Sequence, residues 1–385
     1  MSTLLTDAAS QLATRPDEEH FPTLAAMMAD AQQQRARCSE LRVSDAGVLF
    51  VNDGGRVRVE ATGVDAVSLS HYSARQVGTL CGVPATVQDK LTPSTRALVL
   101  NETFPRDANG HDARRWLVED HPETGRTLRA VTSASYSRLW DASLLAEVDR
   151  WAVGSGWVPA TPEINTDERG TNIKGNTKPA LFRSDRDSFA FFMGGRDEDG
   201  GAFGGLRPGL MVWNSEVGFK SFGFRRFYFR GMCANFLIWD ATAIKTRRAR
   251  HTKGVQRVAR MFSRELERIA QPITTAELDA FATVARVPFI GWKGSDKETR
   301  KEAAAKLYRM TGSKVSQSQA AQAIDAAIDE ERNASAEGAG VFLSAWDVAN
   351  GLTWTAKRQR WQDGRTQLQE AAGEVLTAAA EGRIR

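Results

Sequence analysis

The spacing of apolar residues changes from helical to alternating near residue 41. Within 1–40, residues such as Leu24 and Met27 recur at helical spacing, which predicts an N-terminal helical arm. From Leu41 onward the segments LRVSDAGVLFV and RVRVEA alternate between apolar and polar side chains, with the turn residues DGG between them. This pattern is typical of a β-hairpin, because glycine and aspartate favour tight turns.

The next hundred residues switch between helical and strand patterns. Ser73 is placed to cap a short helix that ends at Leu80, and Pro93 suits the first turn of a helix that continues to Phe104. The runs RRWLVED and RTLRAVTS flank the turn PETG, which predicts a second hairpin. Residues 143–153 return to helical periodicity.

A segment rich in Gly, Pro, Thr and Asn, residues 155–180, predicts a long exposed loop. Four strand-like runs follow: PALFRS, DSFAFFMG, PGLMVWNSEV and GFKSFGFRRFYFRGM. From Val255 the pattern is helical again, and Ser295 with Glu298 matches a capping box for a later helix. The chain therefore reads as hairpins first and helices last.

These elements predict an α+β fold with an antiparallel, hairpin-rich core and packed helices over 41–311, followed by a helical C-terminal region over 312–385. The 385 residues are 42% hydrophobic and 25% charged, as in globular proteins. No stretch approaches the ~18 apolar residues that span a bilayer, and the first residues do not resemble a secretory signal. Three widely spaced cysteines, Cys38, Cys81 and Cys233, suit buried thiols in a reducing cytoplasm.

Most motifs that carry enzyme chemistry are missing from the sequence. It contains no P-loop, no C-x-x-C, no H-E-x-x-H, no G-x-S-x-G and no E-x-K or D-x-K tripeptide, and its five histidines lack zinc-ligand spacing. We therefore expect no cofactor, no metal and no catalytic residue, and enzymatic activity is disfavoured. Scattered acids could still assemble a metal site on folding, so a nuclease stays open as an alternative.

The positive charge is concentrated in one segment, residues 220–268, which we call the basic block. The chain as a whole has a net charge of +4, but the basic block holds thirteen Lys or Arg against three acids. Its net charge of +10 leaves −6 for the remainder. Such a polarised chain is typical of proteins that bind a polyanion.

The basic block combines arginine with aromatic residues. In FGFRRFYFR, strand alternation places Phe, Tyr and Arg side chains together on a face, and a basic loop and an arginine-bearing helix follow. Guanidinium groups neutralise phosphates, while aromatic rings stack on bases of any sequence. The predicted nucleic-acid-binding residues are Lys220, Arg225, Arg226, Phe227, Tyr228, Arg230, Lys245, Arg247, Arg248, Arg250, Lys253, Arg257 and Arg260.

Structural roles compete with several of these interpretations. Phenylalanine-rich strands are usually core, and arginines on a helix usually form a solvated face. Asn214 and Glu216, beside Trp213, could be catalytic, but a role in a turn or a hydrogen-bond network fits them better. Cys233 fits a small buried apolar residue rather than a reactive thiol.

The central segment GLMVWNSEVGFKSFGFRRFYFRGMCANFLIW resembles the phage/plasmid-like protein family of unknown function. Its "NSE-G" strand pair leads to an "R-x-x-C-x-N-x-x-I" segment, here Arg230, Cys233, Asn235 and Ile238, although Phe236 replaces the usual glycine. RAVTSASYSRLWDASLLAEV resembles the hairpin end of that family. The resemblance spans roughly residues 40–365 and implies a protein carried by phages or plasmids in a bacterial cytoplasm, with no established chemistry.

A second resemblance, at the level of fold, is to the single-strand annealing proteins of phages, of the Red-beta, RecT and Erf type. It implies hairpins joined to helices, a basic groove, ATP-independent binding and assembly into rings or filaments. The resulting hypothesis is a homo-oligomeric protein that binds single-stranded DNA and anneals strands in recombination. The alternatives are a metal-dependent nuclease that uses acids such as Asp185, Asp197, Asp199 and Glu216, and an interaction protein that binds an acidic partner.

Overall fold

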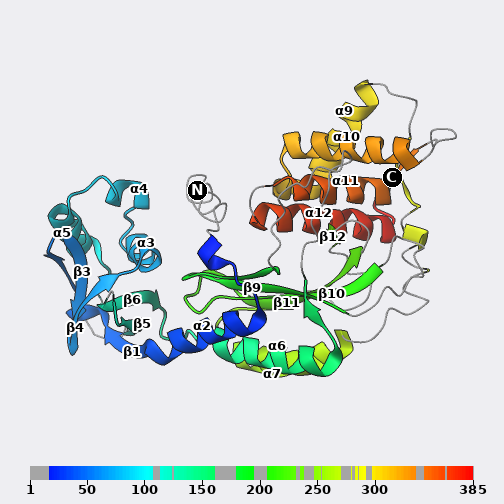
Figure 1. The fold of residues 1–385 in the computed structure, drawn as a ribbon. Coiled ribbons are helices and arrows are strands. Elements are labelled where there is room, and N and C mark those ends of the chain that lie inside the picture. The colour runs from blue at the N-terminus through cyan, green and yellow to red at the C-terminus, as the bar shows by residue number, and fades with distance from the viewer. Residues whose placement is uncertain are drawn as a thin grey trace.

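The computed structural model confirms a mixed α+β fold with mostly antiparallel sheets. A six-stranded sheet lies in the N-terminal part, a seven-stranded sheet lies in the centre, and a helical cluster forms the C-terminal part (Figure 1). The structure describes residues 17–106, 113–123, 125–160, 179–194, 206–230, 235–237, 247–252, 254–269, 279, 282–284, 286–291, 297–334, 342–359 and 362–384.

The N-terminal sheet has the strand order β1-β5-β6-β4-β3-β2, with one parallel pair, β4 and β6. Its strands are β1 (Cys38–Ser44), β2 (Leu49–Asp53), β3 (Arg56–Ala61), β4 (Val64–Leu69), β5 (Ala113–His121) and β6 (Gly125–Thr132). Its helices are α3 (His71–Leu80), α4 (Ala85–Gln88) and α5 (Pro93–Thr103), with a short 3-10 turn at Asp45–Gly47. Val67, Leu100 and Trp116 lie in the shared core. We call this unit the N-terminal lobe.

Both predicted hairpins are present in the N-terminal lobe. Gly54 and Gly55 join β2 to β3 with φ of 58° and 81°, a conformation that side chains with a Cβ rarely adopt. The helix predicted to begin at Pro93 is α5. The residue that caps α3 differs from the prediction. Ser70, not Ser73, is the N-cap, and its side chain accepts a hydrogen bond from the backbone N–H of Ser73. Ser73 itself is buried in the first turn of the helix.

The central sheet has the order β12-β11-β10-β9-β7, and β13 and β8 pair with β11 and β9. Its strands are β7 (Val158–Pro159), β8 (Leu181–Arg183), β9 (Ser188–Met193), β10 (Leu206–Asn214), β11 (Phe222–Arg230), β12 (Asn235–Leu237) and β13 (Arg247–Ala249). The four predicted strand runs correspond to β8 to β11. Most of the loop predicted over 155–180 lies outside the described residues.

Three helices cover one face of the central sheet: α2 (Leu24–Arg37), α6 (Asp141–Ser155) and α7 (Val255–Ile269) (Figure 1). The predicted N-terminal arm is thus α2, preceded by a 3-10 turn at Asp17–Glu19. Phe222 and Phe224 of β11 pack on Phe262 of α7, with ring centroids 5.7 and 4.9 Å apart. This face of β11 is therefore core, one of the two outcomes open from the sequence.

The C-terminal cluster contains α9 (Lys297–Thr311), α10 (Gln317–Ala334), α11 (Ala345–Lys357) and α12 (Gln362–Ala380), with a 3-10 turn at Gly312–Lys314 and the strand pair β14 (Pro288–Gly291) and β15 (Phe342–Ser344). Its core already includes Phe289 and Leu307, so the helical region begins before the predicted boundary at 312. The capping box predicted at Ser295 lies outside the described residues, and Ser344 forms one with Asp347 at α11. No helix among the described residues is long and apolar enough to cross a membrane.

Candidate nucleic-acid interface and the buried ionic cluster

The exposed part of the basic block lies on α7. Val255, Phe262 and Leu266 are buried against the central sheet. The arginines that are exposed on α7 are Arg257, Arg260, Arg264 and Arg268, which we call the α7 arginine face. At 3.6 residues per turn they form one stripe opposite the buried residues, and the stripe is about 16 Å long.

Two neighbouring residues extend the α7 arginine face. Arg250, just before the helix, is exposed. Met261 lies at the edge of the stripe and is 42% exposed, although large apolar side chains are usually covered. Glu265 is mostly buried and its Oε2 lies 3.1 Å from Nη1 of Arg268. The surface thus presents guanidinium groups at intervals of about one helical turn, 5.4 Å, with Met261 at one edge and the exposed Glu267 at the other.

Other predicted binding residues have different positions. Arg226 is only 3% exposed, so it does not lie at the surface as a phosphate contact would require. Lys220 lies with its Nζ 2.8 Å from Oδ2 of the buried Asp187 and contacts the rings of Phe189 and Phe219. An ion pair and two rings therefore hold this ammonium group in place.

Several predicted residues cannot be placed in the interface. Lys245 and Lys253 lie outside the described residues. The following residues have their backbone in β11 or β13, and their side chains lie outside the described part: Arg225, Phe227, Tyr228, Arg230, Arg247 and Arg248. Of the predicted binding residues, Arg250, Arg257 and Arg260 are therefore exposed in the described part of the chain, and Arg264 and Arg268 lie beside them.

The NSE segment that follows β10 is buried in a network of polar side chains. Asn214 donates from Nδ2 to the Leu139 carbonyl oxygen at 2.8 Å and to Oδ1 of Asp141 at 2.7 Å. Ser215 donates from Oγ to the Arg186 carbonyl oxygen at 2.6 Å. Asn214 and Ser215 are fully buried, which confirms the network role favoured for Asn214.

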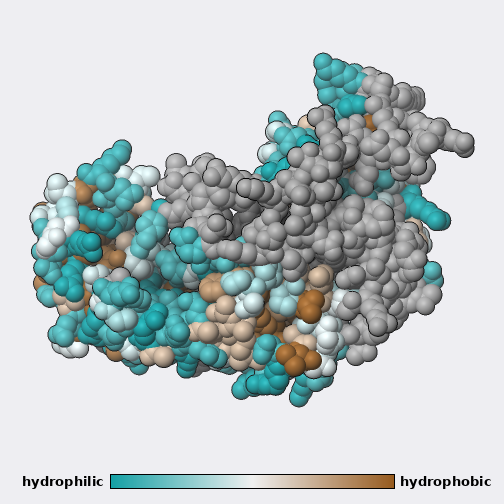
Figure 2. Space-filling model, viewed as in Figure 1, coloured by the Kyte–Doolittle hydropathy of each residue, from teal (hydrophilic) through white to brown (hydrophobic). Residues whose placement is uncertain are grey.

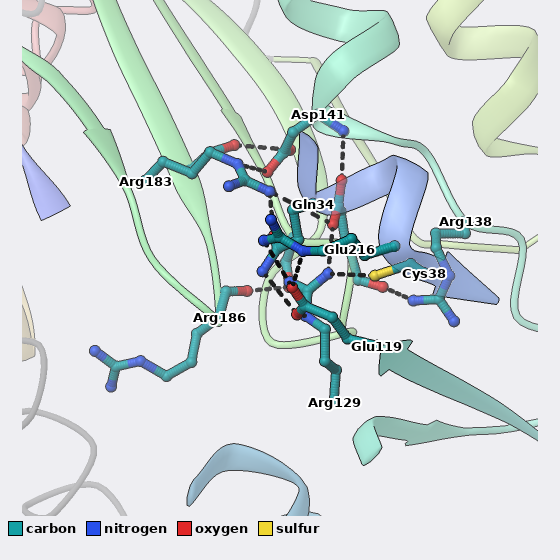
Figure 3. Close-up of polar contacts among 12 residues, drawn as sticks. Gln34, Cys38, Glu119, Arg129, Arg138, Asp141, Arg183, Arg186 and Glu216 are labelled. Carbon is teal, nitrogen blue, oxygen red and sulfur yellow. Dashed lines mark hydrogen bonds and ion pairs between the residues drawn. The ribbon is translucent and has the colours of Figure 1, made fainter. Parts of the chain in front are cut away.

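Glu216 lies between two buried arginines at the N-terminus of α6 (Figure 3). Its Oε2 lies 3.1 Å from Nη1 of Arg129 on β6 and 3.8 Å from Nη2 of Arg183 on β8. Its Oε1 accepts the backbone N–H of Asp141 at 2.8 Å. A carboxylate at this position also interacts favourably with the helix dipole. Glu216 therefore joins the N-terminal lobe, the central sheet and α6.

Further carboxylates compensate the same arginines. Arg183 pairs with Asp141 at 3.2 Å and with Asp30 of α2, and Glu119 of β5 lies 3.6 Å from Arg129. We call the following residues the Glu216 cluster: Asp30, Glu119, Arg129, Asp141, Arg183, Asn214 and Glu216. Burial, and the nearby Glu216 carboxylate, raise the pKa of Asp141, while Arg183 opposes this shift. With four acids around two buried arginines, the cluster needs every partner to remain compensated.

Sequence reasoning found only two residues of the Glu216 cluster, Asn214 and Glu216. The two arginines had a detectable signal: Arg129 and Arg183 interrupt apolar strand runs, LRAV and LFRS, and a charge in such a position needs a buried partner. The sequence does not indicate which carboxylates pair with these arginines, because Arg129 and Glu216 are 87 residues apart.

The cluster also surrounds Cys38. Its Sγ lies 3.4 Å from Nη1 of Arg129, while burial raises the pKa of the Cys38 thiol and Arg129 opposes this shift. A raised pKa disfavours the thiolate that a nucleophile requires. Cys38 and Cys81 are free thiols, as the spacing predicted, and Cys233 lies outside the described residues.

The acids considered for a nuclease do not meet in the described part of the chain. Glu216 belongs to the buried cluster, Asp185 lies 3.6 Å from Arg186, and Asp197 and Asp199 lie outside the described residues. No group of three His, Cys, Asp or Glu that could hold a metal ion occurs among the described residues. No specific observation therefore favours the nuclease.

No protein-family model matches the chain, and no curated protein or solved structure matches it. Function is therefore inferred from the chain's own residues.

Proposed function

We propose that this protein binds single-stranded DNA along the α7 arginine face and promotes the annealing of complementary strands without ATP. The observation that carries the proposal is the stripe of Arg257, Arg260, Arg264 and Arg268, exposed on a helix whose opposite side is anchored in the core. Such a helix presents its guanidinium groups on a rigid support, which lowers the entropic cost of binding.

The chemistry of this surface fits a flexible polyanion. Arginines that follow one another at about one helical turn can each contact a phosphate of an extended strand, and each contact releases counterions. Met261 and Arg250 extend the surface and offer apolar and cationic contacts to bases and backbone. Binding is expected to depend little on base sequence, because none of these contacts reads a base edge.

Fluorescence anisotropy with a labelled single-stranded oligonucleotide tests the proposal. We expect binding at low salt that weakens steeply as salt increases. The triple variant Arg257→Gln/Arg260→Gln/Arg264→Gln should lose most of this affinity. The matched control, Lys297→Gln/Lys301→Gln/Arg309→Gln, removes the same charge from exposed positions of α9 and should bind like the parent protein. Equal losses in both variants, or no binding by the parent protein at low salt, would contradict the proposal.

Annealing is measured separately, by mixing complementary labelled strands with and without the protein in the absence of ATP. We expect faster duplex formation with the parent protein and little acceleration with the triple variant. Solution mass with and without the oligonucleotide reports whether binding is accompanied by assembly into an oligomer. If a labelled acidic peptide binds the parent protein while single-stranded DNA does not, the surface recognises an acidic protein instead.

A further inference from the structure

A cavity of about 350 Å³ with both polar and apolar walls opens in the N-terminal lobe, away from α7. It lies between the β3–β4 hairpin, the first turn of α3, α4 and the start of α5. Figure 2 shows this part of the molecule to be largely hydrophilic on the visible face. Its volume is within the range of small-molecule sites in proteins, which is roughly 300–1,000 Å³.

Three arginines from three different elements line the cavity. Arg56 begins β3, Arg75 lies on α3 and Arg96 lies on α5. None of their guanidinium groups donates a hydrogen bond or forms an ion pair within the described residues, whereas Arg58 nearby pairs with Asp53 at 2.7 Å. Several guanidinium groups that line one cavity without an ion pair are typical of a site for phosphate.

Arg96 is the most constrained of the three arginines. Its Nε is buried without a hydrogen-bond partner, which costs free energy unless a ligand supplies an acceptor. Burial lowers the pKa of Arg96, and the carboxylate of Asp89, which also lines the cavity, opposes this shift. One exposed carboxylate against three guanidinium groups leaves the cavity positively charged.

Gln88 supplies an unpaired acceptor to the same cavity. It is 2% exposed, and its Nε2 donates to the Val83 carbonyl oxygen at 3.0 Å, while its Oε1 is buried without a donor. The side chain is held against Gly78, where an added Cβ would lie 1.7 Å from Nε2 of Gln88. A ligand that fills the cavity could satisfy this acceptor with a hydrogen-bond donor.

The ends of two helices add to the positive potential of the cavity. Both α3 and α5 begin there, and Ser70 and Thr92 cap them by accepting from the N–H groups of Ser73 and Thr95. Helix N-termini attract anions because their backbone N–H groups lack intrahelical partners. This contribution supplements the arginines and does not define the site by itself.

We infer that this cavity binds the phosphate of a small phosphorylated ligand of about the size of a mononucleotide. Arg56, Arg75 and Arg96 contact the phosphate oxygens, and Oε1 of Gln88 accepts from a hydroxyl or amino group of the remainder. This site differs from the proposed DNA surface in its lobe, its residues and its ligand, and neither inference depends on the other.

Isothermal titration of the full chain with pyrophosphate, at constant ionic strength, tests the inference. We expect saturable binding at one site. Arg75→Gln and Arg96→Gln should each weaken it about tenfold or more, since each removes charge-assisted hydrogen bonds. The control Arg42→Gln removes the same charge from an exposed position on β1 outside the cavity and should leave affinity unchanged.

The result that overturns the inference is a lack of saturable pyrophosphate binding, or an equal loss in Arg42→Gln. Circular dichroism of each variant verifies folding, and because Arg75 and Arg96 lie on different helices, each variant tests the site independently. Two further probes separate the sources of phosphate: a nucleoside 5′-monophosphate represents a free ligand, and oligonucleotides with a 5′-phosphate or a 5′-hydroxyl represent a strand end. Binding of the nucleoside monophosphate, or tighter binding of the 5′-phosphorylated oligonucleotide than of the 5′-hydroxyl one, supports the site if Arg75→Gln abolishes it. The probe that shows this effect identifies the source of the phosphate.

Discussion

The Glu216 cluster and the α7 arginine face use the same residue type in opposite environments. In the cluster, Arg129 and Arg183 are buried and several carboxylates lie within 4 Å of them. On α7, four arginines are exposed in one stripe, and the carboxylate of Glu265 contacts Arg268. The first arrangement compensates charge inside the fold, and the second leaves charge available to solvent and to a partner.

The difference separates stability from binding. A buried charge that loses its partner destabilises the fold strongly, because its desolvation is no longer offset. An exposed charge contributes little to stability, because water screens it. Substitutions in the Glu216 cluster should therefore change the free energy of unfolding, and substitutions on the α7 arginine face should change ligand binding. The expected changes in the free energy of unfolding range from several kcal/mol to a few tenths of a kcal/mol.

The largest effect is expected for Glu216→Gln. The substitution keeps the size of the side chain but removes the charge that faces Arg129 and Arg183, and we expect it to lower the free energy of unfolding by about 3 kcal/mol or more. Urea denaturation measures this change. Glu102→Gln, at an exposed position of α5, is the matched control and should unfold like the parent protein. A loss below about 1 kcal/mol for Glu216→Gln would show that the cluster tolerates an unpaired arginine.

Much of this contrast could be predicted from local sequence, and the rest could not. The stripe on α7 follows from helical periodicity, since Val255, Phe262 and Leu266 repeat with the helix and the arginines lie between them. Turn residues likewise predicted both hairpins of the N-terminal lobe. These features depend on residues that are close in sequence.

The Glu216 cluster and the cavity depend on residues that are far apart in sequence. Glu216 meets Asp141 across 75 residues and Arg129 across 87, and no local pattern encodes such pairing. Burial of Arg226 was missed for the same reason, because strand alternation shows which residues share a face and not which face is covered. The three arginines of the cavity are separated by about twenty residues each and form no charge run.

A second prediction concerns His251, at the border between the two regions. It follows the exposed Arg250, but it is 6% exposed and stacks on Tyr136 with ring centroids 5.1 Å apart. Burial lowers the pKa of His251 to about 4, and the Arg138 guanidinium acts in the same direction. The ring is therefore neutral in the folded protein at pH 7. The unfolded chain takes up a proton near pH 6.5, so the contribution to stability is lost as pH falls from 6.5 to 4.

Between pH 6.5 and pH 4, the neutral His251 should cost the parent protein about 3 kcal/mol of its free energy of unfolding. His251→Gln should not show this decrease. Thermal unfolding of both proteins across this pH range gives the difference between them. The pH dependence of one protein alone does not isolate His251, because the raised pKa of Asp141 makes stability increase as pH falls. This contribution is the same in both proteins, so it cancels in the difference between them. A difference between the two proteins that stays constant with pH would show that folding leaves the pKa of His251 unchanged.

A third prediction concerns single arginines on α7. Arg260→Gln should change the free energy of unfolding by less than about 0.5 kcal/mol, since the side chain is exposed. It should, however, reduce the slope of log affinity against log salt by about 1, as expected when one phosphate contact is lost. Titrations with a single-stranded oligonucleotide at several salt concentrations measure the slope. An unchanged slope would remove Arg260 from the interface.

The smallest effect, and the one that distinguishes the two regions most directly, is expected for Glu265→Gln. Glu265 and Arg268 form a pair three residues apart on α7. Glutamine keeps the size of the mostly buried Glu265 side chain, and Arg268 stays exposed to water without its partner, so stability should fall only slightly. The same substitution releases Arg268 and removes one negative charge beside the α7 arginine face, so oligonucleotide binding should become tighter. The control Glu298→Gln breaks a pair of the same spacing with Lys301, at an exposed position of α9, and should leave binding unchanged. Weaker binding by Glu265→Gln would mean that Glu265 positions Arg268 for its ligand, and the face would then resemble the Glu216 cluster, where a carboxylate sets the place of each arginine.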